Sequence, residues 1–370
     1  MQQALSDFSI EGFEALIASW GFKPSHAARL LASYYEGGGA ADWDALALPA
    51  GLRGRIESEL GAEAGEVAAR QEADDGTVKL LLRLRDGRTV EAVMMPDFRG
   101  ERAAGCISSQ VGCAMGCDFC ATTRTGFERN LDEGEMVAQF LALRREALAA
   151  KRRLHTVVFM GMGEPMLNLD AVLEAVRRIA DNRLGRLGWR QVTVSTVGIV
   201  PGMRRLAESG LNVHLAVSLH APDDETRSML LPQGKRFRVE EILAAADAHQ
   251  ARTGRIPIIQ YCLLRGVNDS PAQAERLADL LEGRRMHVNL LRYNPTGAGL
   301  SGRAYEPSPD EAAAAFLAAL RGRGVVAHFR KPRGRDIDAA CGQLRERAEE
   351  SEGDPIAGAD EARKTNARRE

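Results

Sequence analysis

The chain has 370 residues, of which 45% are hydrophobic and 27% are charged, so it can bury the core of one large domain and a smaller one. This composition excludes a disordered or fibrous protein. Lysine and arginine number 49 against 51 aspartates and glutamates, so overall charge does not attract the chain to nucleic acid or to an anionic membrane. Any surface that binds nucleic acid must therefore be local.

The N-terminal stretch mixes polar and apolar residues and lacks the basic start and continuous apolar run of a secretory signal. No segment approaches the roughly 20 apolar residues that cross a bilayer. Four of the six cysteines lie between Cys106 and Cys120, which is too clustered for a general disulfide framework. We therefore expect a cytoplasmic protein without membrane attachment, whose thiols serve metal or redox chemistry.

The first part of the chain predicts a small helical domain. Up to about residue 70, apolar side chains recur at helical spacing, as in Phe13, Leu16, Ile17 and Trp20. We assign residues 1–75 to this accessory domain.

A β-hairpin is predicted next. Residues 77–96 change to an extended period, with Asp86 and Gly87 placed as the turn between two strands. We assign residues 76–98 to this hairpin extension.

From about residue 99 to residue 345, apolar runs alternate with amphipathic helical stretches. The runs that predict strands are residues 155–162, 191–196, 213–219, 256–263, 287–293 and 325–329. Helices are expected at residues 170–182, 238–252, 270–282 and 309–321. This pattern predicts an α/β fold of parallel βα units that close fully or partly into a barrel, with chemistry at the C-terminal strand ends. Residues 346–370 are charged and short of large apolar groups, and we expect a disordered tail there.

Cys113, Cys117 and Cys120 form a CxxxCxxC pattern. Three thiolates within eight residues can wrap one iron-sulfur cluster from a single loop. With three ligands, one iron of a [4Fe-4S] cluster stays open for S-adenosylmethionine, which one electron then cleaves to a 5′-deoxyadenosyl radical. Structural zinc is the alternative, but it ordinarily takes a fourth ligand, and neither Cys106 nor His155 has the usual paired spacing.

Polar residues at several strand ends predict where S-adenosylmethionine binds. The run GMGEP at residues 161–165 brings backbone close to a ligand and offers Glu164 to an ammonium group. Further polar strand ends are Ser195, Ser218, His220 and Asn294. Each alone is also explained by a plain turn or a helix cap, whereas several on one rim favour a ligand-binding ring.

Two further cysteines, Cys262 and Cys341, lie outside the CxxxCxxC triad. Cys262, in an apolar strand, is interpreted as a small buried hydrophobe. Cys341 follows a basic run and precedes Gly342, where an exposed thiolate can be nucleophilic or a small residue can simply fit.

Together, the motifs GCISSQVGCAMGCDFCAT, VFMGMGEPMLNLD, VTVSTVGIVPGM, AVSLHAPDDETR, GVNDS, NLLRYNP and RGRDIDAACGQL resemble the RlmN/Cfr family of radical SAM RNA methyltransferases. The resemblance runs in order from about residue 5 to residue 345. It implies a partial (βα)6 radical SAM barrel with a small N-terminal accessory domain that adds RNA contacts. It also implies an enzyme that methylates an aromatic carbon of adenine in RNA.

The resemblance assigns roles to individual residues. Cys341 is implied to take a methyl group from one S-adenosylmethionine, after which a radical made from a second one abstracts hydrogen from that methyl. Cys106 is implied to release the product through a transient disulfide with Cys341, and Glu91 to accept a proton. The implied cluster ligands are Cys113, Cys117 and Cys120, and the implied S-adenosylmethionine contacts are Gly163, Glu164, Ser195, Ser218, Leu219, His220 and Asn294.

The expected substrate is C2 of an adenine in 23S rRNA, with a tRNA adenine as a further candidate. C8 methylation, or methylation of an unidentified RNA, is the alternative, because Gly234 and Gln260 stand where the family usually has Asn and Glu. A radical enzyme acting on protein or small molecules, and an RNA-binding module with structural zinc, are the competing classes. We expect a monomer that receives electrons from a flavodoxin- or ferredoxin-type donor.

The basic side chains Arg330, Lys331, Arg333 and Arg335 are interpreted either as a solvated stretch or as a site for RNA phosphates.

Overall fold

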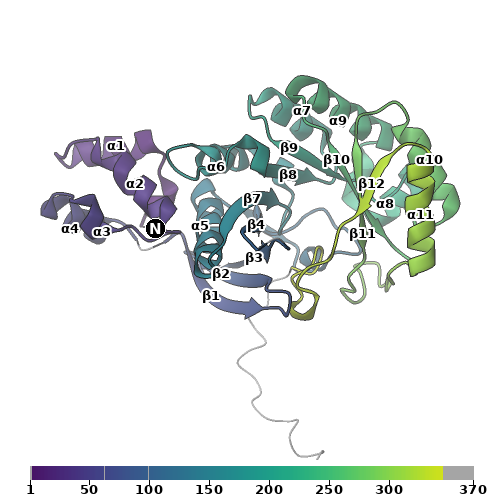
Figure 1. Cartoon of the computed structure of the whole chain (residues 1–370), viewed down its shortest axis with the longest axis horizontal. Coiled ribbons are helices and arrows are strands. Elements are labelled where there is room, and N and C mark those ends of the chain that lie inside the picture. The colour runs from purple at the N-terminus through teal and green to yellow at the C-terminus, as the bar shows by residue number, and fades with distance from the viewer. Residues whose placement is uncertain (1, 62, 99, 345–370) are drawn as a thin grey trace, which may run out of the picture.

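The computed structural model describes residues 2–61, 63–98 and 100–344, and its centre is a ten-stranded sheet. The strands follow the order β1-β2-β3-β4-β7-β8-β9-β10-β11-β12, and helices cover the parallel part (Figure 1). The predicted tail at residues 346–370 lies outside the described residues.

The predicted N-terminal helices are present and form a lobe at one end of the molecule (Figure 1). Ser9 begins the first helix by accepting a hydrogen bond from the Gly12 amide, and Phe13 and Ile17 are completely buried beneath it. The helices are α1 (Ile10–Ser19), α2 (His26–Glu36), α3 (Trp43–Leu46) and α4 (Ala50–Glu59), preceded by the 3-10 turn η1 (Leu5–Asp7).

The expected hairpin is a three-stranded antiparallel unit. Strands β2 (Val78–Leu84) and β3 (Thr89–Pro96) meet at the predicted Asp86-Gly87 turn, where Gly87 has a φ of +83°. The interpretation of the whole segment 1–75 as helical was wrong for β1 (Gly65–Glu72), which pairs with β2. This edge strand is mostly exposed, so its sequence lacks the apolar alternation that identifies a strand.

Seven parallel strands follow, and six of them are the predicted apolar runs. These six are β7 (Arg153–Phe159), β8 (Val192–Thr196), β9 (His214–Ser218), β10 (Ile258–Leu263), β11 (His287–Arg292) and β12 (Val326–Phe329). The seventh, β4 (Arg102–Ile107), was missed because its small residues resemble a linker. Gly105 shows why they are small: a Cβ there would lie 3.0 Å from Leu143 Cδ1. Strand β4 is therefore the first of six βα units, and β12 comes after the sixth.

The helices of these units are α5 (Glu133–Ala149), α6 (Leu169–Ala180), α7 (Val200–Glu208), α9 (Val239–Thr253), α10 (Pro271–Leu281) and α11 (Asp310–Gly322). The four predicted helices correspond to α6, α9, α10 and α11. Smaller elements are α8 (Asp224–Leu230), β5 (Gln110–Gly112), β6 (Phe127–Asn130), η2 (Ala121–Arg124), η3 (Pro165–Leu167), η4 (Trp189–Gln191), η5 (Pro232–Arg236) and η6 (Arg335–Ile337). Among the described residues, no helix has the length and apolarity needed to cross a bilayer.

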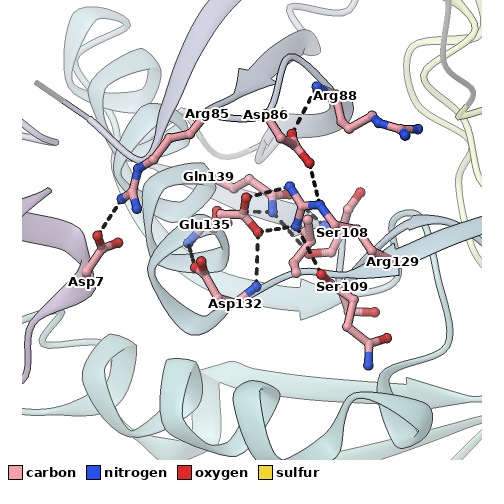
Figure 2. A network of polar contacts seen from close by, with 12 residues as sticks. Asp7, Arg85, Asp86, Arg88, Ser108, Ser109, Arg129, Asp132, Glu135 and Gln139 are labelled. Atoms are coloured by element: carbon pink, nitrogen blue, oxygen red, sulfur yellow. Dashed lines mark hydrogen bonds and ion pairs between the residues drawn. The ribbon is translucent and has the colours of Figure 1, made fainter. Parts of the chain in front are cut away.

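A polar network joins the hairpin unit to the barrel, as Figure 2 shows. Arg129 donates to Asp86 at 2.6 Å and to both oxygens of Glu135 at 2.8 Å, so the β2–β3 turn is tied to the first turn of α5. Asp132 and Glu135 form a capping box at the start of that helix. The N-terminal lobe is connected to the same turn through Asp7 and Arg85, which are 2.5 Å apart.

Replacing Phe316 with Ala tests the packing of α11 on the sheet. Phe316 is 1% exposed, and its ring lies 5.2 Å from that of buried Tyr261. We expect a loss of about 3–5 kcal/mol in the free energy of unfolding, measured by urea denaturation. Phe127→Ala, at a half-exposed ring on β6, is the control and should change stability little. Equal losses in the two variants would contradict this packing.

Candidate active site

A cavity of about 170 Å³ opens at the C-terminal ends of the parallel strands. It is bordered by the loop that carries the cysteine triad, by strand ends, and by the segment that follows β12. The sequence-predicted residues that line it are Cys113, Cys117, Cys120, Gly163, Glu164, Ser195, Ser218, His220 and Cys341. The structure therefore brings together residues from distant parts of the sequence.

The triad forms one wall of this cavity. Cys113 and Cys117 are buried and Cys120 is partly exposed, and all three are free thiols. Burial raises the pKa of Cys113 to about 12, and the pKa of Cys117 is also raised by burial. Among the described residues, no group of three or more His, Cys, Asp or Glu side chains has the arrangement needed to hold a metal ion. The fit to an iron-sulfur cluster rests on the shared wall and on the soft sulfur donors.

Asp118 anchors the loop that carries Cys113, Cys117 and Cys120, which we call the cluster loop. Its carboxylate accepts hydrogen bonds from the Ser301 amide at 2.8 Å, the Ser301 hydroxyl at 2.5 Å and the Tyr305 hydroxyl at 2.7 Å. The Asp118 amide donates to the Leu230 carbonyl at 3.0 Å. Two later segments of the barrel thus fix the residue that follows Cys117 in the triad.

Glu164 lies in the turn that follows β7 and lines the same cavity as the triad. Its carboxylate accepts from the amides of Met166 at 3.0 Å and Val197 at 2.8 Å, and burial raises its pKa to about 7. Gly163 precedes it with a φ of +97°, and a Cβ there would lie 2.5 Å from Gln110 Cβ. Glycine is therefore required at this close approach.

Ser108 connects this turn to neighbouring elements through hydrogen bonds. Its hydroxyl accepts from the Met162 amide at 2.9 Å and donates to the Glu91 carbonyl at 2.7 Å. The Gln139 side chain pairs with both backbone groups of Ser108, at 2.8 and 3.1 Å, in the network of Figure 2. One buried serine thus joins β3, α5 and the turn that carries Glu164.

His220 is a neutral hydrogen-bonding group at the cavity wall. Its Nδ1 accepts from the Cys262 amide at 3.0 Å, which leaves the proton on Nε2. Burial lowers its pKa to about 3, and the adjacent cation of Arg227 acts in the same direction. The ring also contacts Phe119 of the cluster loop edge-on, with centroids 5.0 Å apart.

Two predicted contacts lie away from this main cavity. Leu219 is completely buried and is not among the lining residues. Asn294 lines a smaller adjoining cavity of about 40 Å³, where its Oδ1 accepts from Arg335 Nε at 3.1 Å.

Cys341 is exposed and lines both cavities, whereas Cys106 is buried and lines the smaller one. Both are free, so the expected disulfide is not formed in this structure. Burial raises the pKa of Cys106 to about 12, and the nearby Cys341 adds to the shift. The Cys341 segment is attached to the cluster loop, because the Ala121 amide donates to the Gly342 carbonyl at 2.7 Å.

Glu91 is buried and forms an ion pair with Lys79 at 3.0 Å. It is outside the lining of both cavities. Because side chains alternate along a strand, Glu91 shares a face of β3 with Val93 and Met95, which do line the smaller cavity.

Among the lining residues that sequence reasoning did not assign to the site are Gln260 and Cys262. Both lie on β10 and line the cavity wall. Cys262 is also buried in a hydrophobic cluster, as predicted. Gln260 is 5% exposed, and its Oε1 has no hydrogen-bond partner in the described structure. The alternation of side chains along a strand was the available signal. Tyr261 points into the core, so Gln260 and Cys262 on either side of it point to the opposite face of β10.

Comparisons with known proteins identify the family. Residues 107–281 match the model of the Radical SAM superfamily. "Probable dual-specificity RNA methyltransferase RlmN 1" of Opitutus terrae is 64% identical over 93% of this chain and 97% of its own length. A similarly named protein of Symbiobacterium thermophilum is 43% identical over 94% and 92%.

A solved structure agrees as well. The crystal structure of a radical SAM methyltransferase from Sphaerobacter thermophilus has a TM-score of 0.87 and 42% identity, and the match covers 92% of this chain and 99% of that one. The α/β radical SAM fold and the resemblance noted from the motifs are thereby confirmed. The chain belongs to the RlmN family of radical SAM RNA methyltransferases and is a transferase.

Proposed function

We propose that the chain methylates C2 of an adenine in 23S rRNA, with a tRNA adenine as a second substrate, through a methyl group carried on Cys341. The main support is one observation: the cysteine triad and Cys341 line the same cavity. The name of the relatives, dual-specificity RNA methyltransferase, supports action on more than one RNA.

The residues present fit a [4Fe-4S] cluster and S-adenosylmethionine. Cys113, Cys117 and Cys120 would ligate the cluster, which when bound supplies the electron that cleaves S-adenosylmethionine to methionine and a 5′-deoxyadenosyl radical. Glu164 would accept hydrogen bonds from the ammonium group. Gly163 and Leu219 would offer backbone atoms to the same ligand, and the polar side chains that would complete its site are Ser195, Ser218, His220 and Asn294.

Cys341 would act first as a nucleophile that takes the methyl group of one S-adenosylmethionine. An aromatic C–H carbon of adenine is no nucleophile, so a covalent carrier and a radical step are needed to reach it. Cys341 would then hold its methyl group in the cavity, where hydrogen is abstracted and the resulting carbon adds to the ring.

Product release would use the smaller cavity. The radical adduct would give up one electron to the bound cluster, and Glu91 would take the ring proton. The Cys106 thiolate would then attack the Cys341 sulfur, so that the carbon–sulfur bond breaks, the released carbon is protonated to complete the methyl group, and a transient disulfide forms. Cys106 and Cys341 both line the smaller cavity, which supports this pairing. We expect a cytoplasmic monomer, a flavodoxin- or ferredoxin-type electron donor that also restores the thiols, and RNA contacts from the helical accessory domain, residues 1–75.

The central test is Cys106→Ala, purified without oxygen from cells. Without the resolving thiol, RNA should remain covalently attached to Cys341, and nuclease digestion followed by peptide mass analysis should find the adduct. Cys262→Ala is the matched control, because that thiol also lines the main cavity but should trap nothing. An RNA-free Cys106→Ala protein with an intact cluster would contradict the mechanism.

Mass analysis of nucleosides identifies the ring carbon. RNA from a deletion strain should lack 2-methyladenosine in 23S rRNA and in tRNA, and the cloned chain should restore it. Loss of 8-methyladenosine instead would assign C8, and unchanged RNA would count against both.

Glu164→Gln tests the ammonium contact. The substitution keeps the shape and removes the charge, so we expect affinity for S-adenosylmethionine to fall by about tenfold or more, measured by equilibrium binding to cluster-loaded protein. Iron content should be unchanged. Wild-type affinity at full iron content would show that Glu164 does not hold the ligand.

Gln260→Leu tests the unpartnered amide oxygen. Because this oxygen has no partner among the described residues, its removal should not lower the melting temperature, whereas loss of a ligand hydrogen bond should weaken S-adenosylmethionine binding by up to about tenfold. Unchanged affinity would mean that the ligand does not reach Gln260.

A further inference from the structure

Phe98 is an exposed aromatic side chain with cations against its ring. It lies between β3 and β4, and 67% of its surface is exposed. Lys331 Nζ lies 4.6 Å from the ring centroid, and Arg333 Cζ lies 3.6 Å from it. Both cations come from the segment after β12, so residues far apart in sequence form one small surface.

This surface adjoins the cavity that contains the reactive thiols. Lys331, Arg333 and the intervening Pro332 line the smaller cavity, together with Cys106 and Cys341. A strand of RNA whose adenine reaches Cys341 would therefore pass close to Phe98.

The charges around Phe98 differ in how firmly they are held. Arg333 is fixed by an ion pair with Asp75 at 3.8 Å, and Asp75 also accepts from the Gly334 amide at 3.3 Å. Lys331 is exposed and forms no ion pair within the described residues. The carbonyl of Asp97, the residue before Phe98, accepts a hydrogen bond from Arg152 at 3.1 Å. One cation is thus fixed against the ring, and another is available to a phosphate.

We propose that Phe98, Lys331 and Arg333 form a stacking platform for an unpaired RNA nucleotide next to the target adenine. The base stacks on the Phe98 ring, and the adjoining phosphate pairs with Lys331. Aromatic rings and guanidinium planes are the groups on which proteins stack unpaired RNA bases, and nearby lysines track the backbone. The proposal rests on the proposed function, since it needs RNA at the Cys341 cavity.

The test is the binding of two fluorescent RNA probes to the cluster-loaded protein, a single-stranded oligoadenylate and a blunt duplex, followed by anisotropy. Phe98→Ala should weaken oligoadenylate binding by about tenfold and leave duplex binding nearly unchanged. Phe98→Trp, which keeps a stacking face, should bind like wild type. Lys331→Gln should weaken both probes and reduce the salt slope by about one.

Phe127→Ala is the matched control, because Phe127 is 46% exposed and, among the described residues, has no cation on its ring. It should bind both probes like wild type. Wild-type oligoadenylate binding by Phe98→Ala, or equal weakening in Phe98→Ala and Phe98→Trp, would overturn the platform.

Failure of the proposed function is seen in a separate measurement. Transfer of labelled methyl groups from S-adenosylmethionine to total RNA from the deletion strain tests catalysis by the wild-type protein. Absence of transfer, with Phe98-dependent binding intact, would reject the methylation proposal and leave the platform standing.

Discussion

The attachment of the Cys341 segment to the cluster loop is the interaction on which the site depends. The Ala121 amide donates to the Gly342 carbonyl at 2.7 Å, and the Thr122 hydroxyl donates to the Leu344 carbonyl at 2.6 Å. Figure 1 shows the segment after β12 returning across the molecule toward the first strands. Because Ala121 directly follows Cys120, these two bonds place the exposed Cys341 thiol at the cavity wall that the cysteine triad lines. Under the proposed function, these bonds hold the methyl carrier beside the residues that would ligate the cluster.

A second set of contacts fixes the turn that carries Glu164. Ser108 joins β3, α5 and the Glu164 turn through four hydrogen bonds. Buried polar groups are costly when unpaired, so this fully paired hub specifies one arrangement of the turn. The same serine connects the strand of Glu91 to the residues proposed to hold S-adenosylmethionine. Loss of the Ser108 hydroxyl would therefore disturb both β3, which carries Glu91, and the turn that carries Glu164.

How far the sequence predicts this arrangement depends on the kind of signal. Strands β7 to β12 were predictable because they are apolar runs, whereas exposed β1 and small-residue β4 carry no such pattern. The triad follows from thiol spacing, but roles for Cys106, Cys341 and Glu91 came only from the family resemblance, because proximity of distant residues is a tertiary property. Gln260 was missed because its unpartnered oxygen is visible only once its surroundings are known.

The central claim is that Cys341, among the thiols of the two cavities, carries the methyl group. Three candidates outside the triad line these cavities: Cys106, Cys262 and Cys341. The most direct measurement is anaerobic incubation of the cluster-loaded protein with S-adenosylmethionine bearing a deuterated methyl group, followed by peptide mass analysis. The account predicts the label on the Cys341 peptide alone. Label on Cys106 or Cys262, or on no cysteine while RNA is methylated, would contradict it.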